Sequence, residues 1–200
     1  MASTATPYGL RAVNELGGLP YAGSTRTFLI DPAGYNTNIF NGSIVSVVAS
    51  GYLEIVTTVG SSAGNIFPAG TIGVFVGCSY TNTQGQTVFS QYYPANATNA
   101  VAFVIDDDRT VFQVQAAGTL GQAALGQNAI LNAVQSTSTG STTTGNSTTA
   151  ISISTNTTAT YGLKIVGFVQ STTSTVGDAY TDVLVKFNIG SHAYNTGTGI

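Results

Sequence analysis

The stretch AVAFVIDDDRTVFQVQA, residues 100–116, decides the fold class. In its second half Phe112, Val114 and Ala116 alternate with Gln113 and Gln115. Successive side chains of a β-strand point to opposite faces, so this alternation is typical of a strand with one buried face. The first half is an apolar run of strand length that ends at three aspartates. The stretch therefore predicts two strands.

Similar runs, separated by turn-forming residues, occur along most of the chain. Ser50-Gly51 separates two of them and predicts a hairpin turn. Residues 120–125 and 128–134 are rich in Ala and Leu but are interrupted by glycine, so at most a turn or two of helix is expected. About nine short strands predict an all-β fold, either a β-barrel or a sandwich, with little helix. The predicted strands are residues 27–31, 43–49, 52–59, 71–80, 87–92, 100–106, 110–116, 162–169 and 180–189, with a further strand hidden at 149–154.

The run at 71–80 predicts a strand with two different faces. Glycine and serine occupy one face, at Gly73, Gly77 and Ser79, and leave room for a close neighbour. The apolar face is predicted to carry Ile72, Val74, Val76, Cys78 and Tyr80.

Composition also suggests how the chain is divided. Glycine and proline repeatedly interrupt residues 1–40, which predicts an extended N-terminal arm lying on the chain's own barrel or on a partner. Residues 41–200 are expected to form the β-barrel domain or domains. Residues 106–109 could be a seam between two small barrels, or the turn of a hairpin. Residues 135–160 are rich in Ser and Thr and predict an exposed loop.

Charge is scarce in this sequence. Only 6% of the residues are charged and the net charge is −3, whereas 42% are hydrophobic, so the chain is not of the disordered class. Five scattered cationic residues predict no nucleic-acid partner. The first residues lack the features of a signal peptide and no apolar run is long enough to span a membrane, so we expect a protein made in the cytoplasm without a membrane partner. A nearly neutral surface favours a part of an assembly over a free enzyme.

Two motifs invite a catalytic or metal-binding interpretation. Residues 60–64 read GSSAG, which matches the elbow of serine hydrolases, and Asp182 and His192 could complete a triad around Ser62. The elbow needs a helix after it, and NIFP at residues 65–68 does not start one, so a glycine-rich loop is the preferred interpretation. The run at 106–108 lacks the alternating ligands of a calcium loop and is interpreted as a solvated turn.

The remaining reactive side chains give no site. His192 is the sole histidine and Cys78 the sole cysteine, so neither a histidine pair nor a multi-cysteine site can hold a metal. Cys78 is expected to be a small buried residue. We therefore predict a protein that is not an enzyme and has no cofactor and no bound metal. The absence of Trp and of an acid–base pair also disfavours a sugar-binding module or a glycosidase.

Aromatic residues gather between positions 80 and 93. Tyr80, Phe89, Tyr92 and Tyr93 lie in a hairpin or loop context. They could pack the edge of a barrel, or form a patch that faces another subunit, since tyrosine combines large area with a polar tip.

Four stretches resemble small structural proteins of tailed bacteriophages, especially those of marine and cyanobacterial hosts. They are PYGLR at 7–11 with PYAGSTR at 20–26, IGVFVG at 72–77 leading to FSQYYPA at 89–95, residues 100–107 with FQVQ at 112–115, and VGDA at 176–179 with DVLVKFN at 182–188. The resemblance covers most of the chain except residues 135–160. These motifs are pieces of strand and turn rather than chemistry.

This resemblance implies a capsid decoration, or cement, protein. Such a protein is expected to bind the major capsid protein on the outer surface of an HK97-like virion, as a homo-oligomer (a trimer), and to bridge capsomers, with an arm reaching neighbouring subunits. A tail, fibre or spike component of the virion is the alternative. Candidate capsid or intersubunit contacts are Tyr8, Leu10, Arg11, Tyr21, Arg26, Tyr92 and Tyr93.

Overall fold

The computed structural model describes residues 4–61 and 66–200, and these form two antiparallel sheets. The prediction of an all-β fold is confirmed, and the two sheets are open rather than closed into a barrel over the described residues. Two short 3-10 helices, Gln122–Ala124 (η1) and Ala193–Asn195 (η2), complete the elements. The strands are Arg11–Glu15 (β1), Arg26–Leu29 (β2), Ile44–Val47 (β3), Leu53–Ile55 (β4), Thr71–Thr81 (β5), Thr87–Ser90 (β6), Thr98–Ile105 (β7), Thr110–Gln115 (β8), Asn128–Ala129 (β9), Leu163–Phe168 (β10) and Asp182–Phe187 (β11).

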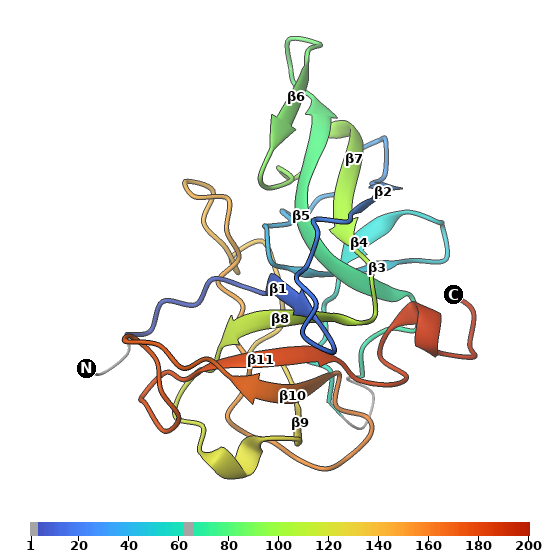
Figure 1. Cartoon of the computed structure of the whole chain (residues 1–200). Coiled ribbons are helices and arrows are strands. Elements are labelled where there is room, and N and C mark those ends of the chain that lie inside the picture. Colours follow the sequence, from blue (N-terminus) through green and yellow to red (C-terminus); the bar gives the residue numbers. More distant parts are fainter. Residues whose placement is uncertain (1–3, 62–65) are drawn as a thin grey trace.

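Sheet A has the strand order β1-β8-β11-β10-β9, and sheet B has the order β2-β7-β5-β3-β4 with β6 added to the far part of β5. In Figure 1 the strands of sheet A lie across the lower half of the molecule, while β5, β6 and β7 rise above them. The turn predicted at Ser50-Gly51 is present, since the Gly51 amide donates to the Val48 carbonyl at 2.7 Å between the paired strands β3 and β4.

Residues 106–109 carry the chain from one sheet to the other. β7 belongs to sheet B and β8 to sheet A, so the strands on either side of this connection do not pair as a hairpin. The aspartate run therefore lies where the two sheets meet.

Two hydrophobic cores result. Core 1 lies between the sheets and joins the inner face of sheet A, including Phe112 and Val185, to Ile44 and Val74 of sheet B. Core 2 lies on the other side of sheet B, where Val45, Phe75 and Val104 meet residues of the flanking loops such as Tyr93. Sheet B is therefore apolar on both faces along part of its length, whereas the apolar side chains of sheet A gather mainly on one face.

Strand β5 does not keep the single apolar face that its alternation predicts. Val74 belongs to core 1, whereas Ile72 and Cys78 belong to core 2 together with Phe75. Pairing shifts between Val45 and Ser46 of β3 and between Phe75 and Gly77 of β5 explain this, because each bulge reverses the side of the residues beyond it. The prediction of one shared face is wrong for this reason.

Residues 4–40 lie on the chain's own sheets. β1 and β2 are the end strands of sheets A and B, and Leu10 belongs to core 1. The side chain of Gln115 binds the backbone before β1, accepting from the Thr6 amide at 2.9 Å and donating to the Thr4 carbonyl at 3.1 Å. In this structure the segment is thus part of both sheets rather than an arm that extends from them.

The Ser/Thr-rich segment is not an exposed loop throughout. Gln135, Ser147 and Ile151 are all 0% exposed, and Thr149 is 5% exposed. The hidden strand predicted there is reduced to isolated bridges of Ile151 with Ala116 and Leu131. Buried hydroxyls and an amide that find hydrogen bonds explain why a polar composition did not mean exposure.

Candidate interaction surfaces

One face of sheet B is open to solvent and apolar. Phe89 of β6 lies opposite Ser79 of β5, Ser79 lies opposite Val101 of β7, and Val101 lies opposite Leu29 of β2. Directly opposite residues in antiparallel strands share a face, so these four residues form one row across four strands. Phe103 is two residues beyond Val101 on β7 and has the same orientation. We call Leu29, Phe89, Val101 and Phe103 the apolar face.

The exposure of this face is unusual for such side chains. Phe89 is 78% exposed and Leu29 is 59% exposed. The Phe89 ring stacks on Phe103 with centroids 6.4 Å apart and an interplanar angle of 14°, so the ring is held against the sheet. The strand that carries it, β6, projects at the top of Figure 1. Exposed aromatic surface of this kind is typical of interaction sites.

The outer face of sheet A has a different character. Lys164 of β10 lies directly opposite Lys186 of β11, and Arg11 of β1 lies on the same face at the level of Gln113. Three of the five cationic residues of the chain are therefore on this face. The guanidinium of Arg11 lies 4.5 Å from the centre of the Tyr8 ring.

Tyr8 joins the N-terminal segment to this face. Its hydroxyl donates to Asp182 at 3.0 Å. Burial and the nearby charge of Asp182 raise the pKa of Tyr8. Burial also raises the pKa of Asp182, whereas the Tyr8 hydrogen bond and Arg11 act in the opposite direction. The pair is a positioned hydrogen bond rather than a reactive centre.

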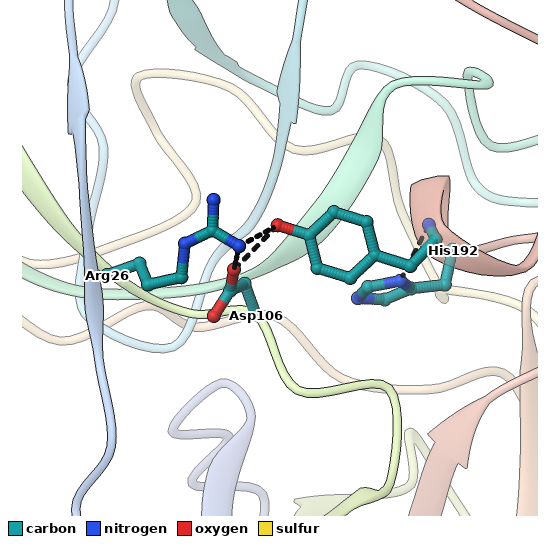
Figure 2. A network of polar contacts seen from close by, with 4 residues as sticks. Arg26, Asp106 and His192 are labelled. Atoms are coloured by element: carbon teal, nitrogen blue, oxygen red, sulfur yellow. Dashed lines mark hydrogen bonds and ion pairs between the residues drawn. The ribbon is translucent and has the colours of Figure 1, made fainter.

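A polar network closes the end of sheet B near the connection 106–109 (Figure 2). Arg26 forms an ion pair with Asp106 at 3.0 Å, and both groups hydrogen-bond the Tyr194 hydroxyl at 2.7 Å. Burial, and then its hydrogen bond to Asp106, raise the pKa of Tyr194 to about 12. Beside it His192 is fully buried.

The residues predicted as contacts do not form one site. Leu10 is 1% exposed and Tyr93 is 0% exposed, so neither side chain lies on the surface of the single chain. The Tyr93 hydroxyl instead binds the backbone of Tyr35 and Ala97 within core 2. Leu10 is buried as an apolar side chain of core 1, and Tyr93 is buried with its one polar side-chain atom hydrogen-bonded.

The other predicted contacts lie apart from one another. Tyr92 is half-buried and stacks on Phe40 with ring centroids 5.6 Å apart. Tyr21 is half-buried and packs against core 1. Arg26 keeps a 61% exposed side chain despite its ion pair, while Tyr8 and Arg11 are together on sheet A.

The hydrolase motif gains no support from the described residues. Ser62 lies outside them. Asp182 begins β11, whereas His192 packs on Phe187, at the opposite end of that strand, with ring centroids 5.4 Å apart. Six strand residues span roughly 17 Å, which is too far for a triad hydrogen bond. Gly60 instead makes room for the ring of Phe67, since a Cβ there would lie 2.5 Å from it.

No group of three or more His, Cys, Asp and Glu side chains able to hold a metal occurs within residues 4–61 and 66–200. None of the helices in these ranges is long and apolar enough to cross a membrane.

Sequence reasoning missed the two faces for the same reason. Leu29, Phe89 and Val101 lie far apart in the chain, and only the pairing register places them in one row. The same is true of Lys164 and Lys186. Apart from the position of Phe89 in an aromatic run, nothing in the sequence indicated that its side chain is exposed.

Cys78 offers a direct test of the packing behind the apolar face. It is 1% exposed, and burial raises the pKa of its thiol to about 12. We expect the native thiol to react with an aromatic disulfide reagent at pH 8 roughly 1000-fold more slowly than the unfolded chain, because only the thiolate attacks. Absorbance of the released thiolate measures both rates. Comparable rates would show that core 2 opens readily.

No protein family, curated protein or solved structure matches this chain.

Proposed function

We propose that the chain is a non-enzymatic structural protein of a virion, which binds the outer surface of an HK97-like phage capsid and bridges its capsomers. The observation that carries the proposal is the apolar face, with Phe89 at 78% and Leu29 at 59% exposure. The sequence resemblance supports it independently of the structure. The major capsid protein is the proposed partner, and the bound form is proposed to be a homo-oligomer, a trimer.

The size of the apolar face suits repeated docking. Four neighbouring strands span only roughly 15 Å, so the face is smaller than the about 800 Å² per partner of a stable interface. A single contact of this size is weak. Several copies that each hold two capsomers gain strength through effective concentration, which is the situation on a capsid.

The chemistry of the face also fits a permanent contact. Its aromatic residues are the type that dominates interface energetics, and no charged residue belongs to it. Binding is therefore expected to depend little on salt, in contrast to a contact made through Lys164 and Lys186 of sheet A.

Binding to purified capsids that lack the protein tests this proposal. The double change Phe89→Ser with Leu29→Ser is expected to weaken binding roughly 30- to 100-fold, equivalent to about 2–3 kcal/mol of lost apolar burial. Leu125→Ser is the matched control, since Leu125 is 45% exposed but lies in the η1 segment away from this face. Cosedimentation over a concentration series measures the affinities, and thermal unfolding verifies that the variants remain folded.

Equal binding by the double variant and the wild type would remove the apolar face from the proposal. Electron cryo-microscopy of the virion would locate the chain: density confined to the tail would favour the alternative of a tail, fibre or spike component. Deletion of residues 1–25 is a poor test, because it removes β1 and Leu10 from the fold.

A further inference from the structure

The C-terminal segment, residues 188–200, crosses the end of sheet B and is held at separate points. Asn188 donates from its side chain to the Tyr161 carbonyl at 3.0 Å, directly after β11. Tyr194 of η2 binds Asp106 and Arg26, as Figure 2 shows. At the end of the chain, Ile200 lines a hollow beside Gly70. The segment thus connects β2, the 106–109 connection and the residues before β5.

His192 belongs to this segment, and its side chain is buried against aromatic rings. Its ring contacts Phe187 and Tyr194 edge-on, with centroids 5.4 Å and 5.1 Å away. Nδ1 accepts a hydrogen bond from the Tyr194 amide at 3.3 Å, and the backbone of Ile72 lies close enough to the ring to favour its protonated form. Nε2 is buried and makes no hydrogen bond. This arrangement suits a neutral imidazole, because Nδ1 must be unprotonated to accept.

Protonation of Nδ1 would oppose the contact with the Tyr194 amide, whereas the Ile72 backbone favours the charged ring. A proton on Nδ1 would face the Tyr194 amide, donor against donor, and the charge would lie in an apolar site. Burial lowers the pKa of His192, while the charge of Asp108, the backbone of Ile72 and then the charges of Asp106 and Asp107 partly counteract it.

The charged residues near the segment would favour the protonated imidazole once it has left its buried site. The connection 106–109 contains the three aspartates and Arg109, and Arg26 of β2 forms an ion pair with Asp106. Lys186, on the strand before the segment, points to the opposite face of sheet A from Phe187. A protonated ring that left its site would therefore move towards a connection in which carboxylates outnumber cations.

We propose that residues 188–200 form a latch that is closed by neutral His192 and released by acid. The latch goes beyond the proposed function and does not depend on capsid binding. The released histidine takes up a proton near its ordinary pKa of about 6.5, and the closed one only at lower pH. The latch is therefore at full strength above about pH 6.5, and it weakens as pH falls towards the pKa of the closed state.

Hydrogen exchange of the full-length protein between pH 5 and pH 7.5 tests the latch, after correction for intrinsic exchange rates. The opening constant of the amides of residues 192–195 is expected to rise about tenfold for each pH unit below about 6.5, because opening takes up one proton. The amides of β8 are expected to stay protected over the same range. The imidazole resonance of the sole histidine provides a second readout by NMR.

Two variants separate the imidazole from the aspartates. His192→Gln keeps an acceptor for the Tyr194 amide without a charge, and its exchange is expected to be independent of pH. Tyr194→Phe loses the bonds to Asp106 and Arg26, so the segment should open more at every pH but keep the tenfold slope; Tyr52→Phe, in the β3–β4 turn, is the matched control. A pH-independent wild type, or a slope retained in His192→Gln, would overturn the proposal. If His192→Gln does not fold, the slope in Tyr194→Phe decides.

Discussion

Replacing Gly73 with alanine is expected to destabilise the protein by at least about 3 kcal/mol, a large part of the stability of a typical domain. A Cβ at this position would lie 1.9 Å from the carbonyl oxygen of Ile105 and 2.9 Å from its carbonyl carbon. Both atoms belong to the backbone of β7, so relief requires the central strands β5 and β7 to separate. The φ angle of Gly73 is +153°, which adds strain for any other residue.

Gly121→Ala is the control for this substitution. A Cβ at Gly121 would meet nothing within 4 Å, and its φ of −90° suits alanine. We expect a change within about 0.5 kcal/mol there. Urea unfolding followed by circular dichroism measures both. A loss below about 1 kcal/mol for Gly73→Ala would mean that β5 and β7 are less tightly apposed than the structure places them.

Gly73 also shows which part of the fold a sequence can predict. The small face of residues 71–80 predicted a close neighbour, and the Ile105 backbone is that neighbour. The same alternation misassigned the apolar side chains, because a bulge depends on the partner strand and leaves no mark in the strand's own sequence. The alternation at 110–116 correctly assigned Phe112, Val114 and Ala116 to a core, but Gln115, on the face predicted to be exposed, is 5% exposed because it binds the backbone of Thr4 and Thr6.

Two strands, β1 and β9, were not predicted from the sequence, for different reasons. β1 contains Arg11 and Glu15 and has only a half-buried pattern, so it lacks the apolar alternation of the other strands. Its position follows from pairing with β8 rather than from its own residues. β9 has two residues, which is below the length at which a pattern can be recognised.

From the sequence, the residue types of the apolar face can be recognised, but their common exposed face cannot. An aromatic run around Phe89 indicated either packing or an interface, and both occur: Tyr93 is buried while Phe89 is exposed. Only three residues separate them in sequence, but Phe89 follows the register of an end strand and Tyr93 bridges to Ile39 in core 2. Exposure of an aromatic residue is thus decided by which face its strand turns outward.

Replacing Gln135 with leucine is expected to destabilise the protein by about 3 kcal/mol, although leucine is similar in size and apolar. The side-chain oxygen of Gln135 accepts from the Ile44 amide at 2.9 Å, and its nitrogen donates to the carbonyls of Ile44 at 3.0 Å and Val56 at 2.9 Å. The side-chain amide of Gln135 therefore makes hydrogen bonds at the start of β3 of the kind that a neighbouring strand would make. Leucine would leave the Ile44 amide and the Val56 carbonyl buried without these partners.

Gln122→Leu distinguishes the loss of these bonds from the loss of an amide in general, since Gln122 is exposed in η1 and its change should stay within about 0.5 kcal/mol. Gln135→Asn keeps the amide but is one methylene shorter, so it should recover little of the stability if reach to both Ile44 and Val56 is what matters. Denaturant unfolding of the three variants measures this order. A Gln135→Leu protein as stable as the wild type would mean that the buried backbone groups find other partners, and that residues 135–151 are held in place by the packing of Ile151 in core 1 instead.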